Sequence, residues 1–448
     1  MRHHNGRMRA LVATLVAGAL AVAAGGCGES DGNGSASPTT GGGAAGDPAT
    51  AWYLTGAPNE EITKKSLEDW NAAHPDQQII GEVYANDPYK EKIRTAVGAG
   101  NPPTLIFNWG AAGVVAEYVA EDKVIDLTGR VDQALSRTLD SINKAGQLDG
   151  KQYGVPIYGT QPVILYYNKA LFEQAGVEAP FETWDDLLAS IPKFKAIGVA
   201  PIALAGQSKW PDLMWLEYLA DRVGGPEAFN AVAAGEADAW SNPDMLTALQ
   251  MIQDLVAADG FQESFGSTTT DSNADVALVH TGEAAMLLQG SWCYGTFKND
   301  APDFVSSGNL GTMVFPTVSG GKGDPNNIAG NPANYFSVAK DATADQQQAV
   351  IDYLNSEAYT DEIVDALIAG GAVPPAKDIE DKLAAADDAD FLIQAYDLVK
   401  NAPNFQMSWD QVLSSVQAQE LLNQLDAIFL GSITPQQFAD NMNAVIGQ

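Results

Sequence analysis

From residue 51 onward, short apolar runs alternate with longer stretches in which apolar residues recur every three or four positions. Residues 51–54, 78–84 and 104–107 have the composition of strands, and residues 60–73 and 88–99 have the spacing of helices. Alternating strands and helices favour a mostly parallel sheet with helices packed against its faces. The sequence therefore predicts an α/β fold.

The length and the charge of the chain limit its organisation and its partners. With 448 residues, the chain exceeds what one hydrophobic core usually organises, so two lobes or domains are expected. The formal net charge of −33 argues against nucleic acid and anionic membrane surfaces as partners, because both require clusters of Lys and Arg. The 2 Cys and 4 His leave little for a disulfide scaffold, a metal site or a His-based triad. We therefore expect no metal, no cofactor and no catalytic residue.

Residues 1–27 have the features of a targeting segment. Three Arg residues precede an apolar run at residues 10–24, which is too short to span a bilayer comfortably. Small residues then lead to Cys27, which resembles the end of a bacterial lipoprotein signal, where the Cys becomes the lipidated first residue. A plain secretory signal with an accidental Cys is the alternative. Residues 28–50 are rich in Gly, Ser, Ala, Thr and Pro and predict a flexible linker.

Three tryptophans lie where predicted strands end. Trp292 follows a strand and a Gly-Ser turn within residues 282–292 (GEAAMLLQGSW), and Trp109 and Trp210 follow the strands predicted at 104–107 and 202–204. In open α/β sheets, ligands bind outside the carboxyl ends of the strands. An indole at such a place can offer its flat face to the apolar face of a sugar ring, although a single Trp of this kind is also common in a core.

The loops at these strand ends also carry side-chain amides. Planar amides bond to hydroxyl groups with a defined geometry, so amides and aromatic rings together favour a sugar site. Residues 154–161, with Pro, Gly, Tyr and Gln, precede a buried strand and are interpreted as a crossing between lobes. The candidate ligand-binding residues are Asn59, Asn86, Asp87, Asn108, Trp109, Tyr158, Gln161, Trp210, Trp292, Asn331, Asn334, Trp409 and Asp410.

A set of short motifs is spread over the whole mature chain. They are the lipoprotein end at Cys27, Tyr89-Lys90, and residues 99–103 (AGNPP), 153–156 (YGVP), 167–169 (YNK), 183–187 (TWDDL), 282–286 (GEAAM), 290–292 (GSW) and 315–316 (FP). In combination they resemble the solute-binding proteins of bacterial ABC sugar importers, in the oligosaccharide-binding group to which the maltose-binding protein belongs.

The resemblance implies a two-lobed, periplasmic-binding-protein-like α/β fold with hinge-crossing strands and a sugar trapped between the lobes. We expect residues 51–159 plus 311–342 to form the N-terminal lobe and residues 160–310 plus 343–448 to form the C-terminal lobe. The resemblance also implies a monomer that is lipid-anchored at the extracellular face of the cytoplasmic membrane. The anchor would be its only contact with the membrane, and its partners would be the sugar and the transmembrane subunits of the importer.

The same resemblance implies roles for individual residues. Trp292 matches the family's stacking Trp after the Gly-Ser turn, and Trp210 matches an aromatic contact in the second lobe. Asn108-Trp109 matches the first-lobe loop that grips the sugar, and Gln161 falls where relatives often have a carboxylate or an amide. Trp409-Asp410 resembles a Trp-Asp pair of disaccharide-binding actinobacterial members.

Two other classes of function stay open. A secreted glycoside hydrolase needs two carboxylates about 5–10 Å apart across a cleft, but the strand-end loops hold mainly amides, and no G-x-S-x-G motif occurs outside the predicted linker. Residues 271–275 (DSNAD) lack the Gly and the distal Glu of a calcium loop. A binding protein for a glycerol-phosphate-type polyol or a peptide is the other alternative. A phosphate would call for basic groups, and Lys209 is the only one in the favoured loops. We interpret Cys293, next to Trp292, as a small buried side chain rather than a reactive thiol.

Overall fold

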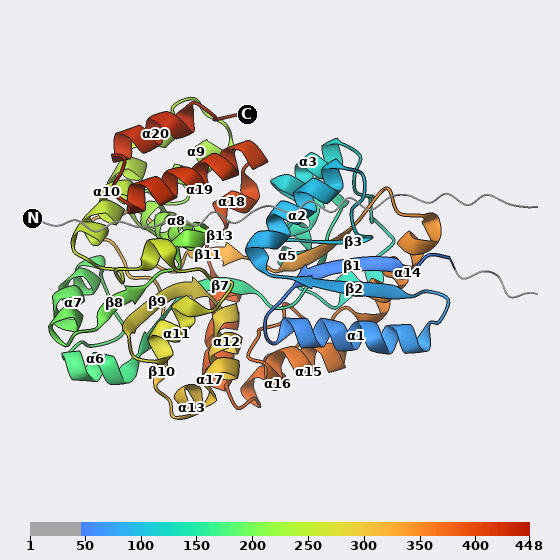
Figure 1. The fold of residues 1–448 in the computed structure, drawn as a ribbon, viewed down its shortest axis with the longest axis horizontal. Helices are drawn as coiled ribbons and strands as arrows, with labels where there is room; N and C mark the ends of the chain where they lie inside the picture. The colour runs from blue at the N-terminus through green and yellow to red at the C-terminus, as the bar shows by residue number, and fades with distance from the viewer. Residues whose placement is uncertain (1–45) are drawn as a thin grey trace, which may run out of the picture. The chain divides into compact units, whose positions relative to one another are not determined.

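The computed structural model describes residues 46–448. The predicted signal at residues 1–27, with the lipidation site Cys27, lies outside the described residues, as does most of the predicted linker at 28–50. Two mixed sheets, each covered by helices, organise the described chain (Figure 1). This architecture confirms the predicted α/β, two-lobed fold class.

The first sheet is built from the strands predicted at the start of the mature chain. β1 (Ala49–Leu54) pairs in parallel with β2 (Ile79–Tyr84) and β3 (Leu105–Asn108). The connecting helices, α1 (Asn59–Ala73) and α2 (Asn86–Gly98), bury apolar side chains such as Trp70 and Ile93 at helical spacing. Parallel strands place their carboxyl ends at one edge of the sheet, and the loops that follow β1 and β3 therefore lie at that edge.

The second sheet has the order β13-β11-β7-β9-β8, and β10 also pairs with β7. Its central strands, β7 (Gln161–Asn168) and β9 (Ala284–Gly290), are buried on both faces, which explains their nearly continuous apolar sequences. Val163 and Leu165 pack into one core, whereas Ile164 and Tyr166 pack into the core on the opposite face. The remaining strands are β8 (Ala200–Ala203), β10 (Leu310–Met313), β11 (Ile328–Asn331) and β13 (Phe405–Met407).

Helices cover both faces of the second sheet. The larger core includes residues of α7 (Trp184–Ala196), α8 (Trp210–Gly224), α10 (Pro243–Ala257), α19 (Ser415–Phe429) and α20 (Pro435–Asn443). The smaller core on the opposite face includes α11 (Ala274–His280), α12 (Trp292–Asp300), α15 (Asp361–Ala369) and α17 (Ala389–Asn401).

Two neighbouring segments carry the chain between the sheets. β6 (Val155–Ile157) belongs to the first sheet, and β7 begins in the second sheet at Gln161. In the reverse direction, β11 ends at Asn331 in the second sheet and β12 (Asn334–Val338) enters the first. The two segments are antiparallel and adjacent, because Asn331 pairs with Gln161 and Asn334 pairs with Ile157. They form the hinge-crossing strands of the expected fold.

The crossings also explain a difference from the sequence-based expectation. The sheets are mixed rather than mostly parallel, since β12 runs antiparallel to β3 and β6, and β7 runs antiparallel to β9, β10 and β11. A strand that returns from the other sheet runs antiparallel to the strands beside which it enters. The pattern of apolar residues predicts that a segment is a strand but does not specify its direction.

The lobe boundaries given above stay a proposal, and strand pairing favours adjusting them at two segments. β10, which the sequence assigned to the N-terminal lobe, pairs with β7 in the second sheet. α14 (Ala344–Glu357), which was assigned to the C-terminal lobe, contributes Val350, Tyr353 and Leu354 to the core of the first sheet. We therefore propose that the second chain crossing is followed by a third, after α14.

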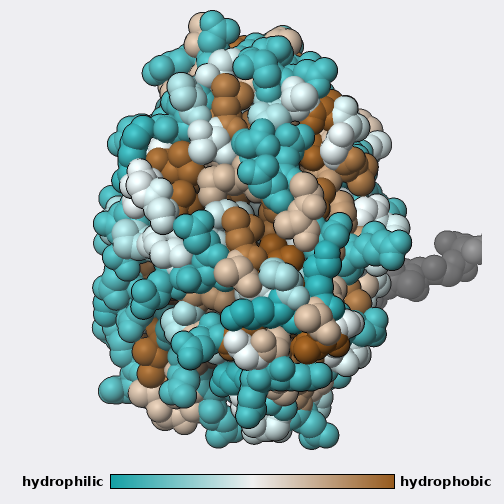
Figure 2. All heavy atoms as spheres, turned by 90° about the vertical axis from the view of Figure 1, so that its left-hand side faces the viewer, coloured by the Kyte–Doolittle hydropathy of each residue, from teal (hydrophilic) through white to brown (hydrophobic). Residues whose placement is uncertain are grey.

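The surface is mainly polar. Figure 2, which views the side on which α7 and α10 lie, shows hydrophilic side chains with apolar ones in separate spots and hollows between them. In the described part of the chain, no helix is both long and apolar enough to cross a membrane.

Candidate functional site

A cavity of about 260 Å³ lies where the two sheets meet the crossing strands; we call it the main cavity. Its lining comes from the loop after β1, the start of α2, the end of β3, both crossings, and several segments of the second lobe. Ten of the candidate residues line it: Asn59, Asn86, Trp109, Tyr158, Gln161, Trp210, Trp292, Asn331, Asn334 and Asp410. Residues from distant parts of the sequence therefore share one opening.

Aromatic rings form much of the main cavity wall. The indoles of Trp210 and Trp292 lie 5.9 Å apart between centroids, at an interplanar angle of 52°. On the first-lobe side, Trp109 stands perpendicular to Phe107 at 5.2 Å. Rings tilted in this way offer several apolar faces to one ligand, which suits a chain of sugar rings better than a single flat molecule.

The local sequence explains the position of Trp292. β9 ends at Gly290 and α12 begins at Trp292, so the indole occupies the first turn of a helix. A Cβ at position 290 would lie 1.8 Å from the Trp292 ring, so only Gly allows the ring to fold over the strand end. Ser291 fixes the turn, since its N–H donates to the Pro162 carbonyl at 2.9 Å and its hydroxyl donates to the Thr160 carbonyl at 2.8 Å.

The crossing strands supply amide groups to the main cavity. Gln161 Nε2 donates to Asn334 Oδ1 at 2.7 Å, which fixes both side chains across the two segments. Within residues 46–448, the buried Oδ1 atoms of Asn59 and Asn331 accept no hydrogen bond. A buried acceptor without a partner costs free energy, so these two oxygens are suited to accept hydrogen bonds from the hydroxyl groups of a ligand.

Tyr158 lines the main cavity. Its hydroxyl lies 2.8 Å from the hydroxyl of Thr63 in α1, and its carbonyl accepts from the Tyr359 hydroxyl at 2.8 Å. Its φ of 63° lies in the left-handed region, where a bulky residue is held only by its surroundings. Burial raises the pKa of Tyr158, so the hydroxyl stays neutral.

Carboxylates that the sequence analysis did not select also line the main cavity. Asp275 is buried in the first turn of α11, where it accepts from Gln289 Nε2 at 3.2 Å and from the N–H of Val276 at 3.0 Å. Burial raises the pKa of Asp275 to about 6, against the opposing effect of the Gln289 hydrogen bond. Burial and then the charge of Asp87 raise the pKa of Asp271. The polar run at 271–275 was the available signal, but it was tested only as a calcium loop.

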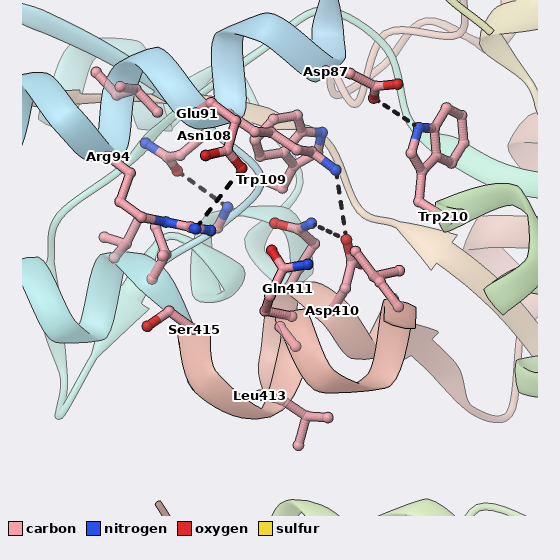
Figure 3. Close-up of a pocket in the computed structure, with 18 of the residues that line it drawn as sticks. Asp87, Glu91, Arg94, Asn108, Trp109, Trp210, Asp410, Gln411, Leu413 and Ser415 are labelled. Carbon is pink, nitrogen blue, oxygen red and sulfur yellow. Dashed lines mark hydrogen bonds and ion pairs between the residues drawn. The ribbon is translucent and has the colours of Figure 1, made fainter. Parts of the chain in front are cut away.

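One lysine bridges the two sides of the site. Lys90 Nζ lies 3.6 Å from Asp410 Oδ2, 5.0 Å from the Trp109 ring centroid and 5.9 Å from that of Trp210. Asp410 belongs to the short helix α18 (Trp409–Val412) and also accepts from Gln411 Nε2 at 2.7 Å (Figure 3). The ammonium group therefore lies at two indole faces and a carboxylate at once.

Two candidate residues lie beside the main cavity rather than in its wall. Asp87 accepts from Trp210 Nε1 at 3.3 Å and faces a neighbouring cavity of about 290 Å³ (Figure 3). Asn108 also faces that neighbouring cavity, and its side chain is engaged by the protein, donating to Ser337 Oγ at 2.9 Å and accepting from the N–H of Gly110 at 3.1 Å. Asn108 thus shapes the β3 turn that carries Trp109.

The structure differs from the sequence-based expectation at Trp409. Its side chain is 1% exposed and stacks on Phe229 with ring centroids 4.3 Å apart, inside the larger core of the second lobe. The N–H of Trp409 donates to the buried Glu217 carboxyl group at 2.8 Å, and this bond fixes the start of α18. The indole therefore points into the core while the adjacent Asp410 faces the cavity.

The main cavity is lined mainly by groups that contact ligands through stacking and hydrogen bonds. Among the described residues, no group of three or more His, Cys, Asp or Glu side chains could hold a metal ion. Cys293 lies in the main cavity wall as a buried thiol whose pKa is raised by burial, so it is not activated as a thiolate. Aromatic faces, amides and hydroxyls account for most of the remaining lining.

A family model and a solved structure each match most of this chain. The family model of the bacterial extracellular solute-binding protein matches residues 51–361. A solved structure from work on xylan utilization by the thermophilic bacterium Caldanaerobius polysaccharolyticus is 28% identical, with a TM-score of 0.80 over 90% of this chain and 100% of that one.

Two curated relatives match part of the chain. An ABC transporter extracellular-binding protein of Pyrococcus horikoshii is 28% identical over 47% of this chain and 46% of its own length. The xylose/arabinose-binding protein XacG of Haloferax volcanii is 28% identical over 55% of this chain and 53% of its own length. The chain thus spans about half the length of these relatives.

Proposed function

Because the chain belongs to the family of bacterial extracellular solute-binding proteins, we propose that it binds an extracellular sugar, a di- or short oligosaccharide, and delivers it to an ABC-type importer in the membrane. The observation that carries the proposal is the main cavity, which is lined by three indoles and by Asn59 and Asn331, whose amide oxygens have no hydrogen-bond partner within residues 46–448. The rings suit the C–H faces of pyranoses, and the amides suit their hydroxyls.

The names of the relatives support the sugar class. One relative is named for xylose and arabinose binding, and one similar structure comes from work on xylan utilization. We therefore place short xylo-oligosaccharides first among the sugars to be tested. The family and the similar structures are solute-binding proteins, which supports a binding role rather than an enzymatic one.

The crossing strands suggest how binding is coupled to transport. Segments between β6 and β7 and between β11 and β12 are short, so a change of a few backbone angles there can move one sheet against the other. A ligand that contacts both lobes favours the closed arrangement by its differential affinity for it. The transmembrane subunits of the importer would then recognise that closed form, with the protein acting as a monomer held to the membrane through a lipid on Cys27.

The charges of the main cavity count against an anionic solute. Asp271, Asp275 and Asp410 line it, and Lys90 is its only basic residue. A phosphate group is usually held by several donors of positive charge, and the single ammonium group here is already paired with Asp410. This observation favours a neutral sugar over a glycerol-phosphate-type polyol.

Titration calorimetry with a panel of ligands tests the proposal. The panel contains xylobiose, xylotriose, maltose and chitobiose, with glycerol 3-phosphate and a dipeptide as representatives of the alternative classes. Saturable binding of at least one sugar, with no release of shorter products after prolonged incubation, is expected. Binding of glycerol 3-phosphate or the dipeptide alone would contradict the sugar assignment, and hydrolysis of a sugar would contradict the binding role.

A further inference from the structure

Two cavities lie on opposite sides of one partition. The main cavity measures about 260 Å³ and the neighbouring cavity about 290 Å³. The residues that line both of them are Lys90, Phe107, Trp109, Trp210, Asp410 and Gln411. The partition is therefore made of side chains from α2, the β3 turn, the start of α8 and α18, and Lys90 has the largest number of rotatable side-chain bonds among them.

The neighbouring cavity has the chemistry of a second sugar-binding space. It combines apolar wall residues such as Ile93 and Leu413 with the polar side chains of Arg94 and Gln411 (Figure 3). Within residues 46–448, the buried hydroxyl of Tyr118, which also lines it, makes no hydrogen bond. A ligand hydroxyl that reached the Tyr118 hydroxyl would find both its donor and its acceptor unused.

The Lys90 ammonium occupies the ring faces that a passing sugar would need. It lies 5.0 Å from the Trp109 centroid and 5.9 Å from the Trp210 centroid, and its partner Asp410 has a side chain that is only 7% exposed. The side chain of Lys90 itself is 25% exposed. A cation held over two indoles and a sheltered carboxylate is displaced only at a cost, because all three contacts are lost together.

We propose that the Lys90–Asp410 pair limits the length of the bound sugar, an inference that rests on the proposed sugar-binding function. A ligand confined to the main cavity leaves the pair intact. A longer ligand must pass between Trp109 and Trp210 into the neighbouring cavity and displace the ammonium group. The pair therefore selects short oligosaccharides over longer ones that carry the same terminal units.

The test compares the affinities of the intact protein for xylobiose and xylotetraose, with maltose and maltotetraose as a second series. Lys90→Met keeps an unbranched apolar stem but removes the ammonium, so we expect the ratio of tetrasaccharide to disaccharide affinity to rise about tenfold. Asp410→Asn removes the other partner and should shift the ratio in the same direction. Two variants on different elements keep the test decisive if one of them folds poorly.

Lys92→Met is the matched control. Lys92 also lies on α2 and over two aromatic rings, at 4.6 Å from Trp52 and 4.2 Å from Tyr84, but it lines neither cavity. The control should leave the affinity ratio unchanged. If the unaltered protein binds a sugar and the ratio stays the same in both Lys90→Met and Asp410→Asn, the length-limiting role is refuted. If the unaltered protein binds no sugar, the proposed function fails and this inference fails with it.

Discussion

The buried carboxyl group of Glu217 gives a prediction whose size follows from the structure. Glu217 lies on α8 with 1% of its surface exposed, and its Oε1 accepts from Ser408 Oγ at 2.9 Å and from the N–H of Trp409 at 2.8 Å. Within residues 46–448, its Oε2 has no partner. Burial raises the pKa of Glu217 from 4.5 to about 8, although the two hydrogen bonds act in the opposite direction.

The sign of the pH effect follows from this raised pKa. Between pH 4.5 and about 8, the folded protein keeps a proton on Glu217 that the unfolded chain has already released. The folded state therefore binds more protons in this window, and its stability falls as the pH rises. With about 1.4 kcal/mol per pKa unit, raising the pH from 5 to 8 should remove about 3 to 4 kcal/mol of unfolding free energy through this group.

The substitution Glu217→Gln isolates this effect. The amide oxygen can still accept from Ser408 and Trp409, but the side chain no longer titrates. The variant should resemble the unaltered protein at pH 5 and exceed its unfolding free energy by a few kcal/mol at pH 8. Urea unfolding followed by tryptophan fluorescence at pH 5, 6.5 and 8 measures the difference between the two proteins. Titration of the other carboxyl groups is common to both and cancels.

Glu236→Gln makes the same substitution at an exposed position and serves as the control. It should alter the pH dependence of unfolding by only a few tenths of a kcal/mol. If the advantage of Glu217→Gln over the unaltered protein changes by less than about 1 kcal/mol between pH 5 and 8, the carboxyl group is not desolvated as described. The interpretation that an uncharged Glu217 side chain fixes the start of α18 would then be wrong.

Three further predictions concern the cavity and the core. Trp292→Ala should weaken sugar binding by about 30-fold or more, because central aromatic contacts commonly contribute 2 kcal/mol or more. The melting temperature without sugar, measured by calorimetry, should shift by only a few degrees. Unfolding of the variant would support a core role for Trp292 instead. Sugar affinity should rise a few-fold from pH 5 to pH 7, because Asp275, with its pKa of about 6, ionises and becomes a stronger hydrogen-bond acceptor. Titration of the Asp275→Asn variant with the same sugar should show no such rise. Trp409→Ala should cost about 3 to 5 kcal/mol in urea unfolding, as expected for a core indole; loss of sugar affinity without loss of stability would contradict its place in the core.

Much of the fold could be predicted because the local spacing of apolar residues indicates where its strands and helices form. The strands that became β1, β2 and β3 and the helices α1 and α2 lie close to the ranges expected from apolar periodicity. The pairing of β10 with β7 and the packing of α14 on the first core could not be read in this way. Both depend on which partner surface a segment meets after the chain has crossed between sheets, and residue spacing carries no information on that choice.

The candidate site was predictable where residue type and position carried the argument. Trp109, Trp210 and Trp292 line one cavity because each follows a strand end, β3 in the first sheet and β8 and β9 in the second, and ligands bind at such ends. The burial of Trp409 could not be predicted from the residue type, because the indole packs against Phe229 and Trp240, which lie far away in the sequence, while the adjacent Asp410 lines the cavity. Asp275 was missed because its polar run opens a helix whose position against the cavity depends on tertiary packing.

The contacts within the site differ in how firmly they are held, and this difference determines what a ligand must contribute. The crossing is fixed by buried bonds, from Gln161 to Asn334 and from Ser291 to Thr160. The contacts between α2 and the second lobe are a 3.3 Å bond from Trp210 to Asp87 and the Lys90–Asp410 pair at 3.6 Å. The long bond from Trp210 to Asp87 is of a kind that usually contributes no more than about 1 kcal/mol, whereas the Lys90 ammonium also contacts two indole faces. A ligand that donates hydrogen bonds to the unpaired oxygens of Asn59 and Asn331, two residues of the main cavity lining, therefore adds to the contacts that favour the closed arrangement.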